Sequence, residues 1–168
     1  EEELLAEEFA DSAVSVLLRA EAASEELALH LGRFAAICRE HTLLDELLGQ
    51  STRGKVTGFA PAGPPTKPTF RQAEELARRT REQLKLGSAP VRSMSGLMEE
   101  LGIRLVWTDA LPEEVQGLSF NDRRMGPSVV ANLRGRVGQW WTLRSTLAHE
   151  LCHILYDRVP AQPLGIAS

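Results

Sequence analysis

The sequence predicts an α+β protein with helices at its N-terminal end, a small three-stranded antiparallel sheet and a final helix. Apolar residues recur every three or four positions over residues 1–48 and again from residue 70. Three strand-like runs lie between residues 103 and 133, with turn-rich segments between them. A further helical pattern begins near residue 142, so the strands are grouped between helices instead of alternating with them.

Residues 1–48 predict two acidic helices, the second with an N-cap at Ser24. Residues 1–50 carry a net charge of −9, whereas the remaining 118 residues carry +5. A solvated helix face explains most of the acidic charge, and neither part has the dense basic stripe of a dedicated nucleic-acid-binding protein. The apolar positions of the two helices are Leu4, Leu5, Phe9, Ala13, Val16 and Leu17, then Leu27, Leu31, Phe34, Ile37, Leu44 and Leu48.

Residues 49–69 are expected to form a linker, because residues 49–68 hold four Gly and four Pro without any periodicity. This segment divides the chain into a helical connector or extension, 1–48, and a globular part, 70–168. The elements expected in the globular part are a helix over Phe70–Leu86, a helix over Ser93–Leu101 ended by Gly102, strands at Ile103–Thr108, Gln116–Phe120 and Ser128–Leu133, and a helix over Thr142–Asp157 that Pro160 and Pro163 prevent from continuing.

The composition is that of an ordinary globular protein, with 43% hydrophobic and 25% charged residues. No apolar run approaches the roughly 18 residues that cross a bilayer, and the acidic N-terminus is unlike a signal peptide. Cys38 and Cys152 cannot form a disulfide framework and suit a reducing compartment. We therefore expect a cytoplasmic protein with no membrane partner. Because the first residue is Glu, the chain is expected to be part of a longer protein.

The final helix carries the clearest chemical signal, the sequence H-E-x-x-H at His149, Glu150 and His153. Residues four apart lie one above the other on a helix, so both imidazoles can reach one metal ion. Glu150 is rotated by roughly 100° from His149, which places its carboxylate beside the metal. There it can take a proton from a zinc-bound water, whose pKa falls to about 7, and pass it to the leaving amine. This pattern predicts a zincin-like site.

The same motif could also arise by chance spacing, or as a pair of core histidines that satisfy each other's hydrogen bonds. The apolar character of the helix favours a metal, because two histidines buried in it would need partners. The residues that make this helix apolar are Leu143, Leu147, Ala148, Leu151, Ile154 and Leu155.

The segment Arg144–Leu155, RSTLAHELCHIL, resembles the signature helix of the ImmA/IrrE-type zinc metallopeptidases. The order of the upstream segments RQAEELARRTREQL, LMEELGIRLVWTDALPEEVQGLSF and SVVANL is similar too. The resemblance covers about residues 70–157, and only H-E-x-x-H is individually specific. It implies a metallopeptidase domain over 70–168, zinc bound by His149 and His153, and Glu150 as the catalytic residue.

The resemblance also implies a biological role. Members of this family are bacterial and phage regulators that cleave a helix-turn-helix repressor and so switch on stress, mobile-element or defence genes. Residues 16–49 are similar to the helical connector of members fused to a helix-turn-helix domain. DNA would then be contacted only indirectly, or through a domain that precedes residue 1. The amphipathic acidic helices would also pack well against a second copy of the chain, as a homodimer.

Two departures from the family pattern bear on the site. A small residue usually stands where this chain has Cys152, which we expect to be a packing residue, with a fourth ligand or a redox-sensitive thiol as alternatives. The family's third ligand is a Glu beyond the motif helix, but residues 154–168 contain no Glu. Asp157 would lie about 12 Å along the helix from His149, too far for one metal. We identify no third ligand in this chain, and expect either that the chain stops before it, that the site is incomplete, or that the ligand comes from elsewhere in the fold.

Two weaker features each allow a structural and a functional role. Ser128–Leu133 could be the sheet edge that aligns an extended peptide, or an ordinary strand. Trp140 and Trp141 are expected to be core or hinge residues, with a substrate-binding rim as the alternative. Two functions follow from the sequence as a whole: a zinc endopeptidase of a bacterial regulatory system, or a catalytically inactive or incomplete module that binds a transcription factor.

Overall fold

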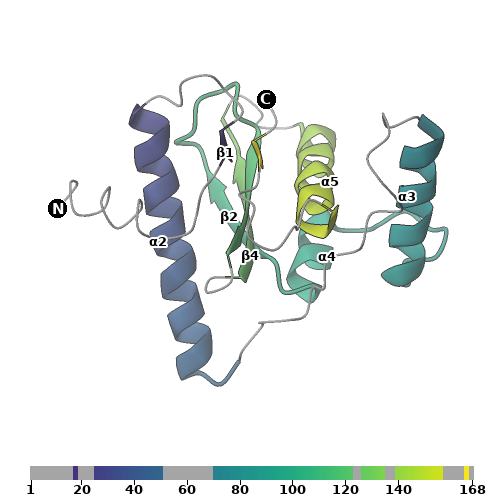
Figure 1. The fold of residues 1–168 in the computed structure, drawn as a ribbon, viewed down its shortest axis with the longest axis horizontal. Coiled ribbons are helices and arrows are strands. Elements are labelled where there is room, and N and C mark those ends of the chain that lie inside the picture. The colour runs from purple at the N-terminus through teal and green to yellow at the C-terminus, as the bar shows by residue number, and fades with distance from the viewer. Residues whose placement is uncertain are drawn as a thin grey trace.

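The computed structural model describes residues 17–18, 25–50, 70–122, 126–134, 139–156 and 165–166. These residues form an α+β fold with four helices and a small three-stranded sheet (Figure 1). Most of the first predicted helix and most of the predicted linker lie outside the described residues, so these two predictions and the division into domains remain predictions. At Leu17 the prediction of a helix is wrong, because this residue pairs with a segment near the other end of the chain as part of a short strand. Two short parallel segments, β1 (Leu17–Leu18) and β5 (Gly165–Ile166), also pair with each other.

The predicted strands are confirmed, but the prediction of an all-antiparallel sheet is wrong. The strands are β2 (Arg104–Thr108), β3 (Gly117–Asp122) and β4 (Gly126–Asn132), in the spatial order β2-β4-β3. Strand β3 pairs antiparallel with β4, whereas β2 pairs parallel with it. The sheet is therefore mixed.

The central position of β4 accounts for this pairing. From Pro127 to Asn132 every residue of β4 is buried, and a strand buried on both faces is most stable between two neighbours. The eight residues from 109 to 116 are long enough to carry the chain from β2 past the position of β4 to the opposite edge, since neighbouring strands are only about 4.8 Å apart. The return through β4 then runs parallel to β2.

The helix α2 (Glu25–Leu47) covers one face of the sheet (Figure 1). Its predicted apolar face is confirmed only in part, because Leu31 and Phe34 are buried whereas Ile37, Leu44 and Leu48 are exposed. Side chains on alternate positions of β3 and β4 meet this helix, because successive residues of a strand point to opposite faces. An ion pair between Arg104 Nη2 and Asp45 Oδ2, 2.8 Å long, joins the end of α2 to β2. The apolar cluster of this face consists of Leu31, Phe34, Leu111, Leu118, Phe120 and Val130.

The other face of the sheet is covered by α4 (Met94–Glu100) and α5 (Trp140–Tyr156) (Figure 1). Helix α4 begins where predicted: the Ser93 side chain accepts a hydrogen bond from the Gly96 N–H at 3.0 Å. It ends at Gly102, whose φ of +73° is the left-handed conformation that glycine adopts most readily. The core here consists of Met94, Leu97, Met98, Ile103, Val129, Ala131, Leu147, Leu151, Ile154 and Leu155.

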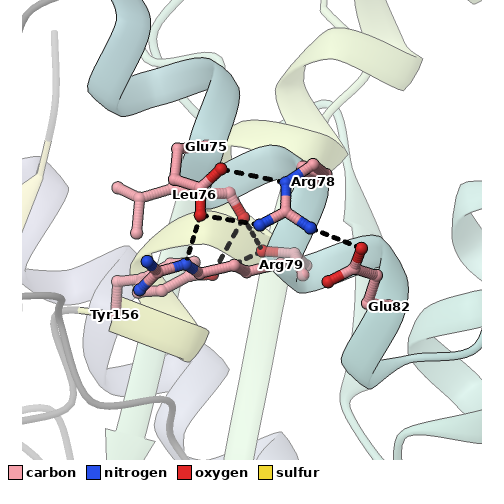
Figure 2. A network of polar contacts seen from close by, with 7 residues as sticks. Glu75, Leu76, Arg78, Arg79, Glu82 and Tyr156 are labelled. Atoms are coloured by element: carbon pink, nitrogen blue, oxygen red, sulfur yellow. Dashed lines mark hydrogen bonds and ion pairs between the residues drawn. The ribbon is translucent and has the colours of Figure 1, made fainter.

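Helix α3 (Phe70–Gln83) lies beyond α5, as the outermost layer (Figure 1). The prediction of this helix is confirmed, but none of its residues is fully buried, and even its small apolar residues Ala73 and Ala77 are exposed. Two hydrogen bonds join it to α5. Thr80 Oγ1 hydrogen-bonds to the Tyr156 hydroxyl. The same hydroxyl donates to the Leu76 carbonyl (Figure 2). Among the described residues, no helix has both the length and the apolar character to cross a membrane.

Candidate active site

Helix α5 carries all three residues of the H-E-x-x-H motif and is amphipathic rather than buried throughout. Its inner face packs on the sheet, and Glu150 lies on that face with an exposed fraction of only 5%. His149 is exposed and His153 is partly exposed. The expectation that the histidines lie in a buried helix is therefore wrong, because Ala148 and the residues near it in the helical projection face outward.

The two imidazoles converge. The Nε2 atoms of His149 and His153 are 2.9 Å apart, and their ring planes are nearly perpendicular, at 82°. At this distance one ring can donate a hydrogen bond to the other, provided that they hold complementary tautomers. The spacing of four residues thus brings the two nitrogens to a common point outside the helix, as expected from helical geometry.

The same arrangement fits a zinc ion. Two nitrogens bound to one tetrahedral zinc at about 2.0–2.1 Å lie about 3.3 Å apart, which follows from the bond length and the tetrahedral angle. The separation of 2.9 Å between His149 Nε2 and His153 Nε2 differs from that value by only a few tenths of an ångström. A small rotation of either ring would accommodate the metal. The donor set, two aromatic nitrogens, is also one that zinc prefers.

Within the ranges that the structure describes, no third His, Cys, Asp or Glu joins these two histidines in a group that could hold a metal. Asp157 and the segment after it up to residue 164 lie outside those ranges.

Glu150 lies against the first residue of β3. A Cβ atom built on Gly117 would come within 3.2 Å of Glu150 Oε1 and within 2.9 Å of Thr146 Cγ2. Glycine is therefore the residue that allows α5 to approach the sheet so closely and leaves room for the carboxylate. Sequence reasoning did not single out Gly117, although a glycine inside a strand pattern is a signal of close backbone approach.

The chain that leads into Gly117 is held by Asn132, a second residue that the sequence did not reveal. The Asn132 side chain is buried, and its amide donates to the carbonyls of Pro112 at 2.9 Å and Val115 at 2.7 Å. Its carbonyl oxygen accepts from the Arg134 N–H at 3.0 Å. One side chain at the end of β4 thus fixes the loop before β3, and with it the position of Gly117 beside Glu150.

The structure also bears on three weaker expectations about the site. The prediction that Cys152 is a packing residue is wrong, because Cys152 is exposed on the outer face of α5. Of the two alternatives for Ser128–Leu133, the ordinary strand is confirmed and the sheet edge is wrong, since β4 is the central strand and β3 is the edge strand next to α5. Trp140 and Trp141 are exposed at the start of α5, so neither is a core residue.

Comparisons of the chain with protein-family models, with curated proteins and with solved structures found no match.

Proposed function

We propose that this chain is a zincin-like, zinc-dependent endopeptidase, with His149 and His153 as metal ligands and Glu150 as general base and acid. The observation that supports this most directly is the convergence of the two histidine Nε2 atoms to 2.9 Å on the exposed face of α5. Structural zinc sites are closed by four protein ligands and favour Cys, whereas a site on an exposed face with two histidines has room for a substrate.

Zinc bound there would supply a Lewis acid that polarises the scissile carbonyl and makes water a nucleophile at neutral pH. Glu150 would accept the proton of the attacking water and deliver it to the nitrogen of the leaving amine. Its burial between α5 and β3 suits this role, because Gly117 and Thr146 restrict the positions that the carboxylate can take. A positioned carboxylate contributes more to the reaction than one free to rotate.

The sheet offers a place for the substrate backbone. Strand β3 is an edge strand among the described strands, and it starts at Gly117, next to Glu150. An extended peptide that adds to this edge would present its amide groups to the catalytic carboxylate. The substrate we propose is a protein, a helix-turn-helix repressor, and the setting is a bacterial regulatory system of the ImmA/IrrE type in the cytoplasm.

The proposal is tested with Glu150→Gln, which removes the carboxylate and keeps the size of the side chain. We expect about one zinc per chain in both the wild-type protein and the variant, measured by elemental analysis after gel filtration. Cleavage of labelled casein and of purified helix-turn-helix repressors should fall about 100- to 10,000-fold in the variant. His149→Ala should lose both zinc and cleavage. Equal proteolysis by the Glu150 variant would rule out the mechanism.

A second candidate function, a catalytically inactive module that binds a transcription factor, is favoured by a different observation. The C-terminal end of α2 and the residue after it expose four leucines, Leu43, Leu44, Leu47 and Leu48. Exposed apolar patches of this kind often mark protein contacts, including contacts with a second copy. This function predicts that repressor binding, measured by calorimetry, survives His149→Ala and is weakened by Leu44→Ser, and that no cleavage accompanies it.

A further inference from the structure

Two tryptophans stand exposed at the beginning of α5, a position that the proposed chemistry does not use. Trp140 is 65% exposed and Trp141 is 57% exposed. Tryptophan has a large apolar ring and is mostly buried in proteins, so two neighbouring exposed rings need an explanation. The loop from β4 to α5 ends directly before them, which places the pair at one end of the exposed face of the motif helix.

Contacts with each other and with Arg144 hold the two tryptophan side chains in place. The rings of Trp140 and Trp141 are arranged edge to face, with centroids 6.0 Å apart. The Arg144 guanidinium lies 5.9 Å from the centroid of the Trp140 ring and donates hydrogen bonds to the carbonyls of Val91 at 2.7 Å and Arg92 at 3.1 Å. Arg144 therefore ties Trp140 to the segment before α4, and Trp140 in turn supports Trp141. A ring held in this way binds a ligand with little further loss of side-chain entropy.

Trp141 shares the exposed face of α5 with the histidines. At about 100° per residue, Trp141 is nearly in line with Ala148 and Cys152, and it lies less than a quarter of a turn around the axis from His149. All four of these residues are exposed. Eight residues of helix separate Trp141 from His149 by about 12 Å along the axis. A peptide that leaves the β3 edge at the scissile bond and continues along the exposed face of α5 covers this axial distance in three to four residues, at about 3.3–3.6 Å per residue.

From this arrangement we infer that Trp141 forms a substrate subsite that binds an aromatic or aliphatic side chain three or four residues from the scissile bond. The inference rests on the proposed endopeptidase function. The charge near the pair favours an apolar occupant over a cationic one, because Arg144 already takes the cation–π position at Trp140 and would repel a second positive charge. Trp141 is thus a specificity-determining residue and Trp140 is a positioning residue.

The experiment is a cleavage profile of the zinc-loaded chain on a library of peptides from a digested bacterial proteome, with the cut sites identified by mass spectrometry. The wild-type protein should enrich Phe, Leu, Ile, Tyr or Trp at one position three or four residues from the cut. Trp141→Ala should reduce this enrichment about 10- to 100-fold and still cut peptides that lack the apolar residue. Trp141→Phe keeps an aromatic face and should retain the preference. Phe70→Ala, at an exposed aromatic residue of α3, is the matched control and should leave the profile unchanged.

The outcomes separate the two proposals. Cleavage with no preference at this distance, or a preference that survives Trp141→Ala, overturns the subsite and leaves the endopeptidase function standing. Absence of cleavage by the zinc-loaded wild-type protein overturns the endopeptidase function, and the subsite falls with it. Circular dichroism shows whether each variant is folded. If Trp141→Ala does not fold, Trp141→Ser takes its place: loss of the apolar preference in Trp141→Ser and its retention in Trp141→Phe supports the subsite, and an equal preference in both overturns it.

Discussion

The two faces of the three-stranded sheet are built from alternate residues of the same strands, yet they differ in chemistry. The face under α2 is mainly an apolar cluster, with the buried Ser128 beside Cys38 and an ion pair between Arg104 and Asp45 at its margin. The face under α5 has an apolar core as well, but it also buries the Glu150 carboxylate and Thr146 against Gly117. The buried carboxylate with a proposed role in chemistry therefore lies on the α5 side of the sheet.

This difference shows how a small fold can combine stability with a reactive site. Burial of a carboxylate is costly, and a sheet covered by polar groups on both faces would have little to hold it together. The α2 face contributes apolar packing and holds no residue of the proposed reaction. Its contribution to the free energy of folding offsets the cost of burying Glu150 and of placing a glycine in β3 on the α5 face. If this division is correct, substitutions in the cluster under α2 should change the free energy of unfolding and leave the site intact, whereas substitutions at Glu150, Thr146 or Gly117 should change activity more than stability.

The largest effect on stability is expected from Phe34→Ala, in the cluster under α2. Removing this buried ring should lower the free energy of unfolding by about 3–5 kcal/mol, because it leaves a cavity between α2 and the sheet. Denaturant unfolding measures the change, and Phe70→Ala, at an exposed ring, should change it by less than about 0.5 kcal/mol. Zinc content of the folded Phe34 variant should equal that of the wild-type protein. A loss of zinc would show that the two faces are not independent.

The ion pair at the margin of the α2 face should have a smaller effect. Asp45→Asn removes the carboxylate that lies 2.8 Å from Arg104 Nη2, and the guanidinium is largely buried, with a side chain only 13% exposed. We expect a loss of about 1–2 kcal/mol, less than for a fully buried pair, because the Asp45 side chain is partly exposed. A double-mutant cycle with Arg104→Met measures the interaction. A coupling energy near zero would mean that α2 is held by apolar contacts alone.

On the α5 face, Gly117→Ala should reduce activity more than stability. The added methyl group would come within 2.9 Å of Thr146 Cγ2 and 3.2 Å of Glu150 Oε1, so both side chains would have to move. The expected cost in stability is about 1–2 kcal/mol, whereas a displaced carboxylate can lower the rate of cleavage about 100-fold. Unfolding curves and kcat measure the two effects. Thr146→Ser removes the nearer clash and should restore part of the rate to the Gly117 variant. Full activity of folded Gly117→Ala would show that Gly117 is not needed to position the Glu150 carboxylate.

The smallest effect is expected far from both faces, on α3. Arg78 and Arg79 hydrogen-bond to the Glu75 carboxylate and lower its pKa to about 2 from its ordinary value of 4.5 (Figure 2). A depressed pKa means that this network stabilises the helix above pH 4.5, and that the stabilisation disappears as the pH falls from 4.5 towards 2. Since these side chains are exposed, the effect is small. Melting temperatures of the wild-type protein and Glu75→Gln should differ slightly at about pH 6 and converge near pH 2. A constant difference would show that the network does not act through this carboxylate.

Local patterns predicted the helices α2 to α5 and the three-stranded sheet's strands, but not the short strands β1 and β5. Apolar periodicity found α2, α3, α4 and α5 to within a few residues, and the alternating runs found β2, β3 and β4. The spacing of His149 and His153 predicted that both imidazoles point to one place, and their Nε2 atoms lie 2.9 Å apart. These predictions succeeded because each depends on residues that lie close together in the chain, where helix and strand geometry fix the neighbours.

Predictions about burial and pairing were less successful. The apolar residues of the motif helix predict a buried helix, but α5 has an exposed face. The sequence of Ser128–Leu133 fits a sheet edge and an ordinary strand equally well, and only the fold shows that β4 lies in the centre. In both cases the outcome depends on which distant element covers a surface, and residues that are far apart in the sequence decide it.

The order of the amino acids is enough to show that a helix carries His149, Glu150 and His153, and that the two imidazoles face the same point, because the α-helix repeats every 3.6 residues. The folded chain was needed to show that the histidines face outward while Glu150 faces the sheet, and that Gly117 makes room for the carboxylate. The central place of β4 and the edge position of β3 also became known only from the fold. The physical reason is that packing and strand pairing join segments far apart in the chain, and local sequence patterns do not specify which segments meet. The strand order is decided by burial, because the most apolar strand, β4, is most stable between two neighbours.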